Sequence, residues 1–330
     1  MMEKPVALDT KNNTWIEVQY VDLSGPERPP PNDDSWKSLD TAIYVGISSL
    51  MDDRCGRTLH SLLTTAKNPE RVHIGIVQQN DKETKDCIED IQTSKRFANS
   101  DQFFLETKCM QKKKEYCAMM KKEAKDKKEE DCPYVNNVKT IRITNEEAKG
   151  PNLARGLQLL MHDGEEFCMQ IDSHSFAGKA WDVQMLQDWG ACNNELAVLT
   201  TYIGSPENLG QNVMGAHEVP HLCTAYFNDD FPFNDRASAA RNLQKPILAP
   251  LWAGGLSFSK CHAEWIVKYD VNLLQIWTGE EFGRGARLWT HGYDFYTPTK
   301  AIIAHDYTPG RKQNIFLFAK LSKKKKKFSL

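Results

Sequence analysis

The stretch TAIYVGISSLMDDRCGRTLHSLLTTAKNPERVHIGIV, residues 41–77, decides the fold class. Its opening residues, 41–47, are rich in β-branched and aromatic side chains and predict a short strand. Residues 55–66 carry apolar side chains at helical spacing, and residues 72–77 predict a second strand. A strand, a helix and a strand this close together form a βαβ unit, whose strands pair in parallel through a right-handed crossover. We therefore predict an α/β domain with a mainly parallel central sheet flanked by helices.

Two more strands are expected downstream of this unit. Residues 138–144 (VKTIRIT) predict one, and a helix over 152–162 leads into the apolar run FCMQID at 167–172. Asp172 therefore ends about the fourth strand of the sheet. Ligands of open α/β sheets bind beyond the carboxyl ends of the strands, so a ligand-binding or catalytic site is expected at Asp172.

The tripeptide Asp172-Ser173-His174 is the first candidate site. Residues two apart in an extended chain point to the same side, so Asp172 and His174 present a carboxylate and an imidazole to one spot. This pair suits manganese or a similar divalent ion, with coordination positions left for phosphate oxygens. His305 ends another short apolar run and is the candidate third ligand. The alternative is a turn contact of Asp172, with His174 as a surface histidine and His305 as a structural one.

Aromatic residues, glycines and turn residues mix in the second half of the chain and predict a shaped, partly polar pocket. The pair Gly254-Gly255 lets the backbone approach a ligand closely, or forms an ordinary tight bend. Residues 276–281 (IWTGEE) place two acidic side chains beside Trp277. Acidic side chains accept hydrogen bonds from sugar hydroxyls, and an aromatic ring covers the C–H face of a sugar. The alternative is that the two acids only stabilise the N-terminus of a helix.

Composition excludes several classes of protein. The net charge is −2, from 42 Lys and Arg against 44 Asp and Glu, so neither nucleic acid nor a membrane surface is an expected partner. The chain has no apolar run long enough for a transmembrane segment, and the N-terminus lacks a secretory signal core. Nine scattered cysteines without C-x-x-C spacing argue against a zinc knuckle and a full disulfide framework. A reducing, cytoplasmic setting is expected.

Several longer motifs carry a family resemblance. AGGLSFSK (253–260), IWTGEEFGRGARLW (276–289) and a terminal strand ending in His305 resemble the catalytic segment of the glycosyltransferases that initiate mucin-type glycosylation. YVGISSLMDDRCGRTL, AKNPERVHIGIVQQN, ARGLQLL, GEEFCMQIDSH, WDVQML and GEEFGRGARLWTHGYDFYTP resemble glycosyltransferase family 60 more closely. Those cytoplasmic enzymes add N-acetylglucosamine to a hydroxyproline in the adaptor subunit of SCF ubiquitin ligases. The resemblance covers roughly residues 40–310 and implies a GT-A type fold.

The resemblance also implies a role for each candidate residue. Manganese, or a similar divalent cation, would be coordinated by Asp172, His174 and His305. The cation would bind the diphosphate of a uridine sugar nucleotide. The nucleotide would be lined by Ser48, the acidic pair Asp52 and Asp53, and Arg155. The donor sugar would face Gly254, Gly255 and Glu280, and the place where sugar and acceptor meet would lie near Glu281, Trp277 and Trp289.

The implied organisation has three parts. Residues 1–39 form an N-terminal extension that ends in a Pro-rich polar arm, residues 40–320 the catalytic domain, and residues 321–330 a basic tail. The domain divides into a nucleotide and metal half (40–174) and a sugar and acceptor half (175–320). A Lys- and Glu-rich insertion at about 105–132 is expected to be a solvated helix, because its charges are mixed in sign.

The implied activity is retaining transfer of N-acetylglucosamine from UDP-GlcNAc to a hydroxyproline of the SCF adaptor. Two alternatives stay open: a UDP-sugar transferase with Ser, Thr or a glycan as acceptor, and a non-catalytic nucleotide-sugar-binding protein. Metal ligands and sugar contacts kept together favour an enzyme. The oligomeric state is open, a homodimer among the options.

Overall fold

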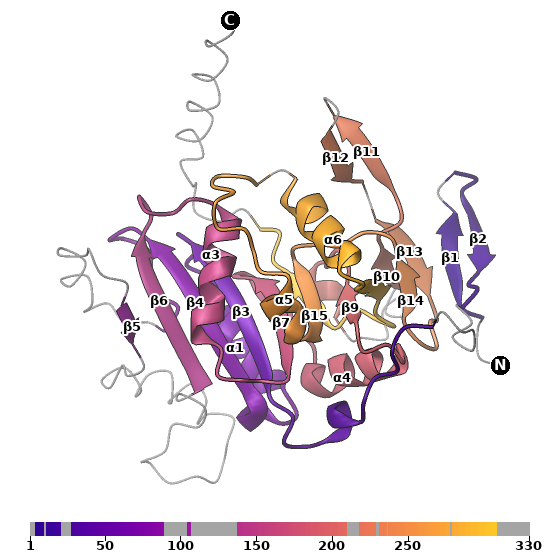
Figure 1. The fold of residues 1–330 in the computed structure, drawn as a ribbon, viewed down its shortest axis with the longest axis horizontal. Coiled ribbons are helices and arrows are strands. Elements are labelled where there is room, and N and C mark those ends of the chain that lie inside the picture. Colours follow the sequence, from indigo (N-terminus) through magenta and orange to yellow (C-terminus); the bar gives the residue numbers. More distant parts are fainter. Residues whose placement is uncertain are drawn as a thin grey trace, which may run out of the picture.

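A computed structural model describes residues 4–9, 11–20, 28–88, 104–106, 137–209, 218–228, 231–235, 237–277 and 279–308. Figure 1 shows a twisted central sheet with helices against it and smaller sheets toward the N-terminal side. The basic tail and nearly all of the charged insertion lie outside the described residues.

The central sheet of the described chain has nine strands in the order β14-β16-β9-β15-β7-β3-β4-β6-β5. The four predicted strands are neighbours and parallel: β3 (Ile43–Leu50), β4 (Val72–Asn80), β6 (Val138–Thr144) and β7 (Phe167–Asp172). β9 (Ala197–Thr200) and β16 (Asp294–Thr297) run the same way, whereas β5 (Phe104–Glu106), β14 (Ile247–Ala249) and β15 (Leu256–Lys260) are antiparallel. Most strands therefore share one direction, which confirms the mainly parallel sheet.

Helices cover both faces of the sheet because side chains alternate along each strand. Ile43, Val45 and Ile47 of β3 point toward α1 (Cys55–Thr65) and α4 (Trp181–Ala191). Tyr44 points the opposite way, toward the face covered by α3 (Pro151–Gln158). That face also carries α5 (His262–Ile266) and α6 (Glu280–Thr290), in front of the sheet in Figure 1. The predicted helices over 55–66 and 152–162 correspond to α1 and to α3 with a following 3-10 turn, Leu159–Met161.

Short strands and turns complete the described chain. A four-stranded sheet has the order β10-β13-β1-β2, formed by β1 (Val6–Asp9), β2 (Thr14–Glu17), β10 (Glu218–His221) and β13 (Ser238–Arg241). β11 (Ala225–Asn228) pairs with β12 (Phe231–Asn234), and β8 (Ser175–Ala177) with β17 (Ile303–His305). Further 3-10 turns are Ser35–Lys37, Pro69–Arg71 and Pro206–Asn208. The hairpin of β1 and β2 was not predicted.

The Pro-rich arm is fastened to the domain. Trp36 packs directly on Gly190 of α4, where a Cβ atom would collide with the indole. Lys260, at the end of β15, is 5% exposed and lies 2.7–2.8 Å from carboxylate oxygens of Asp33, Glu166 and Glu195. Burial lowers the pKa of Lys260, but the three carboxylates outweigh this and raise it above its ordinary value. The arm is therefore anchored through charge as well as packing.

Within the residues that the structure describes, two disulfides join Cys55 to Cys87 and Cys168 to Cys261. The scattered cysteine spacing did not predict these bonds. Structural disulfides are typical of oxidising compartments, so they weigh against the reducing setting expected from that spacing. The cytoplasmic location stays a prediction. Within the described part of the chain, no helix combines the length and apolar character that crossing a bilayer requires.

Removing the Cys168–Cys261 bond is expected to destabilise the domain. The cysteines are 93 residues apart, and loss of a native disulfide typically costs about 2–5 kcal/mol. A Cys168→Ser/Cys261→Ser variant should therefore unfold at a lower temperature in circular dichroism melts. Cys223→Ser, at a free and partly exposed cysteine, is the control and should change stability by less than about 0.5 kcal/mol. Free thiols at both positions in mass spectra of the non-reduced protein would contradict the assignment.

Candidate active site

Three side chains from distant parts of the sequence converge at the carboxyl end of β7. Asp172 ends the strand, and His174 follows in the turn before β8. The antiparallel pairing of β8 with β17 sets His305 opposite Ser175, which brings it beside His174. The ligand atoms of Asp172, His174 and His305 all lie within 4.8 Å of one another. Strand pairing thus brings together residues that lie more than 130 positions apart.

The ring nitrogens show how this group is oriented. His305 Nε2 lies 3.4 Å from Asp172 Oδ2, while its Nδ1 is buried without a hydrogen-bond partner among the described residues. His174 Nδ1 lies 2.6 Å from Asp52 Oδ2, which leaves its Nε2 as the available nitrogen. The two imidazole rings meet edge to face, with centroids 4.3 Å apart. One carboxylate oxygen and one nitrogen from each ring are therefore in place to share a ligand.

This donor set fits a divalent cation. Metal–oxygen distances of about 2.0–2.6 Å allow ligand atoms up to about 5 Å apart to bind one ion. A carboxylate with two imidazoles suits manganese and neighbouring first-row metals. Burial raises the pKa of Asp172, but the hydrogen bond with His305 and the charge of Arg155 outweigh it and keep that pKa below its ordinary value. Asp172 is 34% exposed, so the site is open to a second ligand.

Arg155 of α3 connects this group to the turn between β14 and β15. Its guanidinium forms an ion pair with Glu280, at the start of α6, and lies 3.7 Å from Asp172 Oδ1. It also donates a hydrogen bond to the Gly254 oxygen at 3.1 Å. Burial raises the pKa of Glu280, and the charge of Arg155 opposes this shift only in part. The carboxylates of Glu280 and Asp172 therefore both lie beside the buried guanidinium of Arg155.

Of the two glycines, Gly254 allows this close packing. A Cβ atom on Gly254 would lie 3.0 Å from the Arg155 guanidinium, and one on Gly255 would lie 3.5 Å from Asp172 Oδ2. Larger side chains would fill the space beside the carboxylate. Glu281 fixes the same turn, because its carboxylate accepts hydrogen bonds from the Gly254 N–H at 2.9 Å and the Tyr202 hydroxyl at 2.9 Å. Glu281 therefore ties the turn, through one oxygen, to Tyr202, through the other.

A model of the family described as "Glycosyltransferase (GlcNAc)" matches residues 42–329, nearly the whole chain. The protein belongs to this glycosyltransferase family. Among curated proteins, no match was found.

The solved structure of GalNAc-T7 is similar in fold to this glycosyltransferase. The crystal structure of GalNAc-T7 with UDP, GalNAc and Mn2+ is similar at a TM-score of 0.51 and 15% identity, over 84% of this chain and 46% of that chain. The mannosyltransferase PcManGT of Pyrobaculum calidifontis, in complex with GDP-Man and Mn2+, has a TM-score of 0.45 and 9% identity, over 93% of this chain and 69% of that one. The likeness to GalNAc-T7 confirms the GT-A fold that the sequence implied. The glycosyltransferase spans less than half the length of GalNAc-T7 in that structure.

The other predicted site residues lie at different distances from the group formed by Asp172, His174 and His305. Ser48 is the register partner of Asp172 on the neighbouring strand, so it lies beside the cation ligands. Asp53 is exposed and accepts a hydrogen bond from the Lys85 N–H at 2.9 Å. It lines a cavity of about 640 Å3 along α1 rather than contacting Asp172 in the described structure. Trp277, 52% exposed, precedes α6, and Trp289, 67% exposed, lies in its last turn. Neither has a described contact to Asp172, His174 or His305.

Tyr307 is a site residue that the sequence did not single out. Its ring lies 4.2 Å from that of His305, and its hydroxyl donates a hydrogen bond to the Ile203 oxygen at 2.6 Å. It follows His305 by two residues, and this i, i+2 spacing in an extended segment was the available signal. Contact with this tilted ring restricts the movement of the His305 imidazole.

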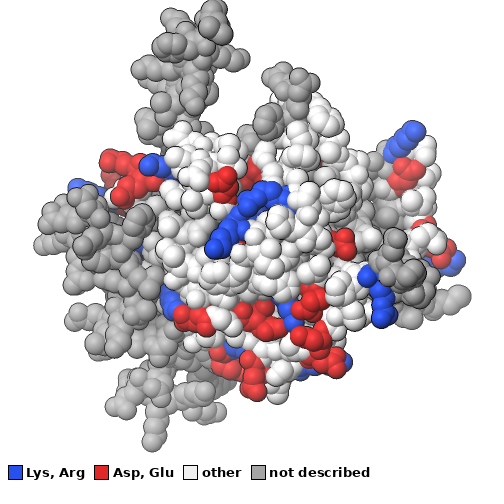
Figure 2. Space-filling model, viewed as in Figure 1, with Lys and Arg blue, Asp and Glu red and all other residues white. Residues whose placement is uncertain are grey.

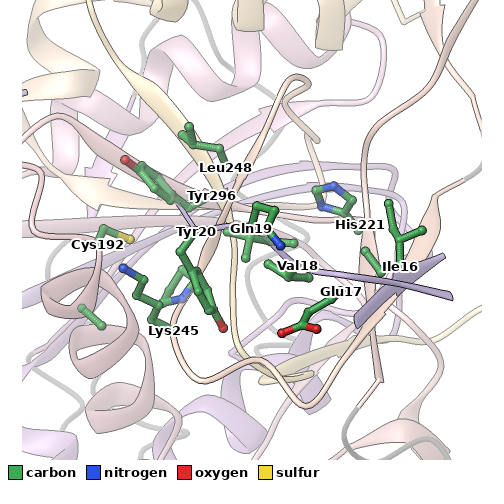
Figure 3. A pocket seen from close by; sticks show the side chains of 14 residues that line it. Ile16, Glu17, Val18, Gln19, Tyr20, Cys192, His221, Lys245, Leu248 and Tyr296 are labelled. Atoms are coloured by element: carbon green, nitrogen blue, oxygen red, sulfur yellow. The ribbon is translucent and has the colours of Figure 1, made fainter. Parts of the chain in front are cut away.

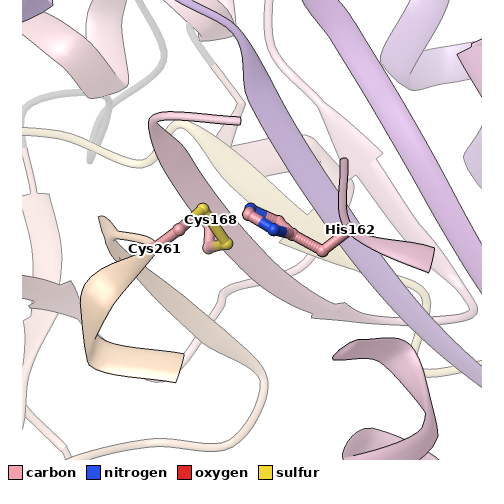
Figure 4. A group of neighbouring side chains, drawn as sticks. All are labelled: His162, Cys168 and Cys261. Carbon is pink, nitrogen blue, oxygen red and sulfur yellow. A yellow bond between two sulfur atoms is a disulfide. The ribbon is translucent and has the colours of Figure 1, made fainter. Parts of the chain in front are cut away.

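A second cluster of metal-ligating residue types in the glycosyltransferase does not form a metal site. His162 lies beside Cys168 and Cys261, but their sulfurs are joined in a disulfide (Figure 4). A disulfide offers no thiolate to a cation. His162 Nε2 lies 3.1 Å from the Glu165 oxygen, and its Nδ1 accepts a hydrogen bond from the Gly164 N–H at 3.3 Å. The imidazole is thus a structural one.

A separate cavity of about 290 Å3 lies between the N-terminal segment and α4 (Figure 3). Tyr20, Cys192, His221 and Lys245 are among its lining residues. Burial raises the pKa of the Cys192 thiol, which disfavours the reactive thiolate. None of the candidate residues for binding the cation, the nucleotide or the sugar lines this cavity.

Proposed function

We propose that this glycosyltransferase moves N-acetylglucosamine from UDP-GlcNAc to a hydroxyproline of a cytoplasmic protein, the adaptor subunit of SCF ubiquitin ligases. The observation that carries the proposal is the convergence of Asp172, His174 and His305 beside the Gly254-Gly255 turn. The family description supports the sugar, and the UDP and Mn2+ bound in GalNAc-T7 support a uridine nucleotide and a divalent cation. The sequence resemblance to family 60 supports the acceptor.

The donor site would be built around the diphosphate. Asp172, His174 and His305 would hold a divalent cation, whose chemistry is to neutralise charge on a departing diphosphate. Arg155 contributes a fixed positive charge 3.7 Å from Asp172, and such preorganised charge stabilises charge that develops in the transition state. Ser48, next to Asp172 in the sheet, would line the nucleotide. Asp53 is proposed for the outer edge of the nucleotide site only.

The donor sugar would lie against the turn and the start of α6. Glu280 would accept hydrogen bonds from sugar hydroxyls while Arg155 holds its carboxylate in place. Gly255 leaves room for the ring beside Asp172. The exposed rings of Trp277 and Trp289 would cover the acceptor side. Figure 2 shows that the face over α5 and α6 is mostly uncharged but is crossed by a band of basic side chains, whereas acidic side chains gather at the lower edge, around α4.

The arrangement favours front-face attack with retention of configuration. A covalent mechanism needs a free carboxylate nucleophile. Glu281 accepts hydrogen bonds from three partners, and Glu280 is held by Arg155, so neither is free for that role. In the proposed step the acceptor oxygen bonds to the anomeric carbon as the bond to the diphosphate breaks. The hydroxyl proton passes to the leaving phosphate oxygen.

A second candidate function keeps the UDP-sugar donor and changes the acceptor to Ser, Thr or a glycan. The two disulfides favour it, because they are typical of oxidising compartments and thus of secretory acceptors. A non-catalytic nucleotide-sugar-binding protein is the remaining alternative.

UDP release and mass spectrometry together test the proposal. The protein with Mn2+ is expected to transfer sugar from UDP-GlcNAc faster than from UDP-GalNAc, and EDTA should abolish turnover. One SCF-adaptor peptide, made with hydroxyproline, proline or serine at the same position, should gain the mass of N-acetylhexosamine only in the hydroxyproline form. Modification of the serine form would instead support the second candidate. UDP-GlcNAc binding without any UDP release, with or without acceptor, would support the non-catalytic one.

A further inference from the structure

We infer that Asp52 is a positioning residue, which fixes the His174 imidazole for cation binding and ties it, through Arg54, to the segment that carries His305. The inference rests on the proposed function, because it concerns the same cation site. The resemblance assigned Asp52 to the nucleotide, whereas the structure places its carboxylate behind His174.

The contacts of Asp52 set the tautomer of His174. Asp52 follows β3 by two residues, and its side chain is 5% exposed. Its Oδ2 lies 2.6 Å from His174 Nδ1 and accepts a hydrogen bond from Ser173 Oγ at 2.8 Å. An ionised carboxylate can only accept, so Nδ1 carries the proton and Nε2 keeps its lone pair. Metal-ligating histidines commonly donate their second N–H to a carboxylate in this way.

Arg54 extends this support to the other histidine ligand. Its Nε donates to Asp52 Oδ1 at 2.8 Å, and its Nη1 donates to the backbone oxygens of Asp306 at 3.1 Å and Thr308 at 2.9 Å. The Asp306 N–H in turn donates to the His174 oxygen at 2.8 Å. One carboxylate–guanidinium pair therefore joins the segments that carry His174 and His305. Loss of Asp52 should loosen both ligands rather than one.

The neighbouring acid shows that this arrangement is specific. Asp53 is exposed, and the described contact of its carboxylate is with the Lys85 N–H. Both oxygens of Asp52, in contrast, face donors, namely the Arg54 backbone N–H at 3.1 Å and the side chains named above. Of the acidic pair, only Asp52 contacts a candidate cation ligand in the described structure.

Asp52→Asn tests the inference on the whole chain. An asparagine would turn an NH2 group toward donors and remove the charge that orients Nδ1. We expect the Mn2+ dissociation constant, measured by the electron paramagnetic resonance signal of free Mn2+, to rise about 10–100-fold. The Mn2+ concentration for half-maximal UDP release should rise by the same factor, while turnover at saturating Mn2+ falls less. A purely structural role would lower the folded fraction without moving either constant.

Asp188→Asn is the matched control. Asp188 is also a buried carboxylate, it accepts hydrogen bonds from Thr299, and it contacts none of the candidate ligands in the described structure. The Mn2+ dissociation constant of Asp188→Asn should equal that of the wild type. Asp52→Ala is the second variant, in case asparagine prevents folding, and added formate should restore part of its Mn2+ affinity.

The outcomes separate this inference from the proposed function. Mn2+ binding by the wild type with an unchanged constant in a folded Asp52 variant would overturn the inference and leave the function standing. A wild type that binds no Mn2+ would overturn both. Failure of both Asp52 variants to fold would mark Asp52 as a structural residue and also overturn the inference.

Discussion

The Asp172→Asn variant should release UDP from UDP-GlcNAc at least about 1,000 times more slowly than the wild type, equivalent to about 4 kcal/mol in the barrier. Asparagine keeps the size of the side chain but removes the charge that Arg155 and His305 face. The only anionic oxygen among the three proposed ligands disappears with it. Because the side chain is partly exposed, the fold should survive the change.

Two measurements check this expectation. Circular dichroism melts should place the unfolding temperature of Asp172→Asn within a few degrees of the wild type, and Mn2+ titration should show weaker binding. Asp188→Asn serves again as a buried-carboxylate control that keeps its turnover. Turnover of folded Asp172→Asn within about tenfold of the wild type would remove the carboxylate from the reaction and, with it, the proposed donor site.

The Glu280→Gln variant should lose both stability and activity. Arg155 is buried, and breaking a buried ion pair from one side typically costs about 3–5 kcal/mol because a charge is left uncompensated. Asp172 lies close enough to offset part of this cost, so we expect the lower end of that range. Turnover of the folded fraction should fall about 100-fold, because the sugar loses a charged acceptor and the guanidinium is free to move.

A double-mutant cycle separates the two effects. Arg155→Gln combined with Glu280→Gln should be less destabilised than the sum of the single variants, with a coupling of about 1–3 kcal/mol. Glu264→Gln is the matched control, because Glu264 pairs with buried Arg284 at 2.9 Å on the same face of the sheet. It should lose stability and keep its turnover per folded molecule. Additive losses at 155 and 280 would argue that the pair does not act as a unit.

The sequence predicted the parallel half of the sheet well. β3, β4 and β7 are buried on both faces, so most of each strand appears as an apolar run. The predicted strands 41–47 and 72–77 stop three residues short of the ends of β3 and β4, because polar side chains begin there. The direction of β15 could not be predicted in this way. It is fully buried and packs between β7 and β9, but its antiparallel pairing depends on how the chain returns from the preceding loop.

The candidate site was predictable only in part. Asp172 and His174 share a local pattern, whereas His305 joins them through the pairing of β8 with β17, each only three residues long. The apolar run that ends in His305 made it a candidate ligand, and the resemblance implied the same role, but neither showed how the chain brings it beside His174. The role of Asp52 was missed because the loop after β3 has no repeating pattern that shows which of two adjacent acids turns inward. The disulfides were missed for a related reason, since Cys168 and Cys261 meet only after β7 and β15 pair.

The anchored arm bears on how this protein should be shortened for laboratory work. The family match begins at residue 42, which invites removal of everything before it. That cut would strip β1 from β13 and leave unpaired backbone along its edge, a known template for aggregation. It would also uncover the surface of α4 beneath Trp36 and take away one counter-ion of Lys260. The sensible expression boundary therefore lies ahead of residue 4.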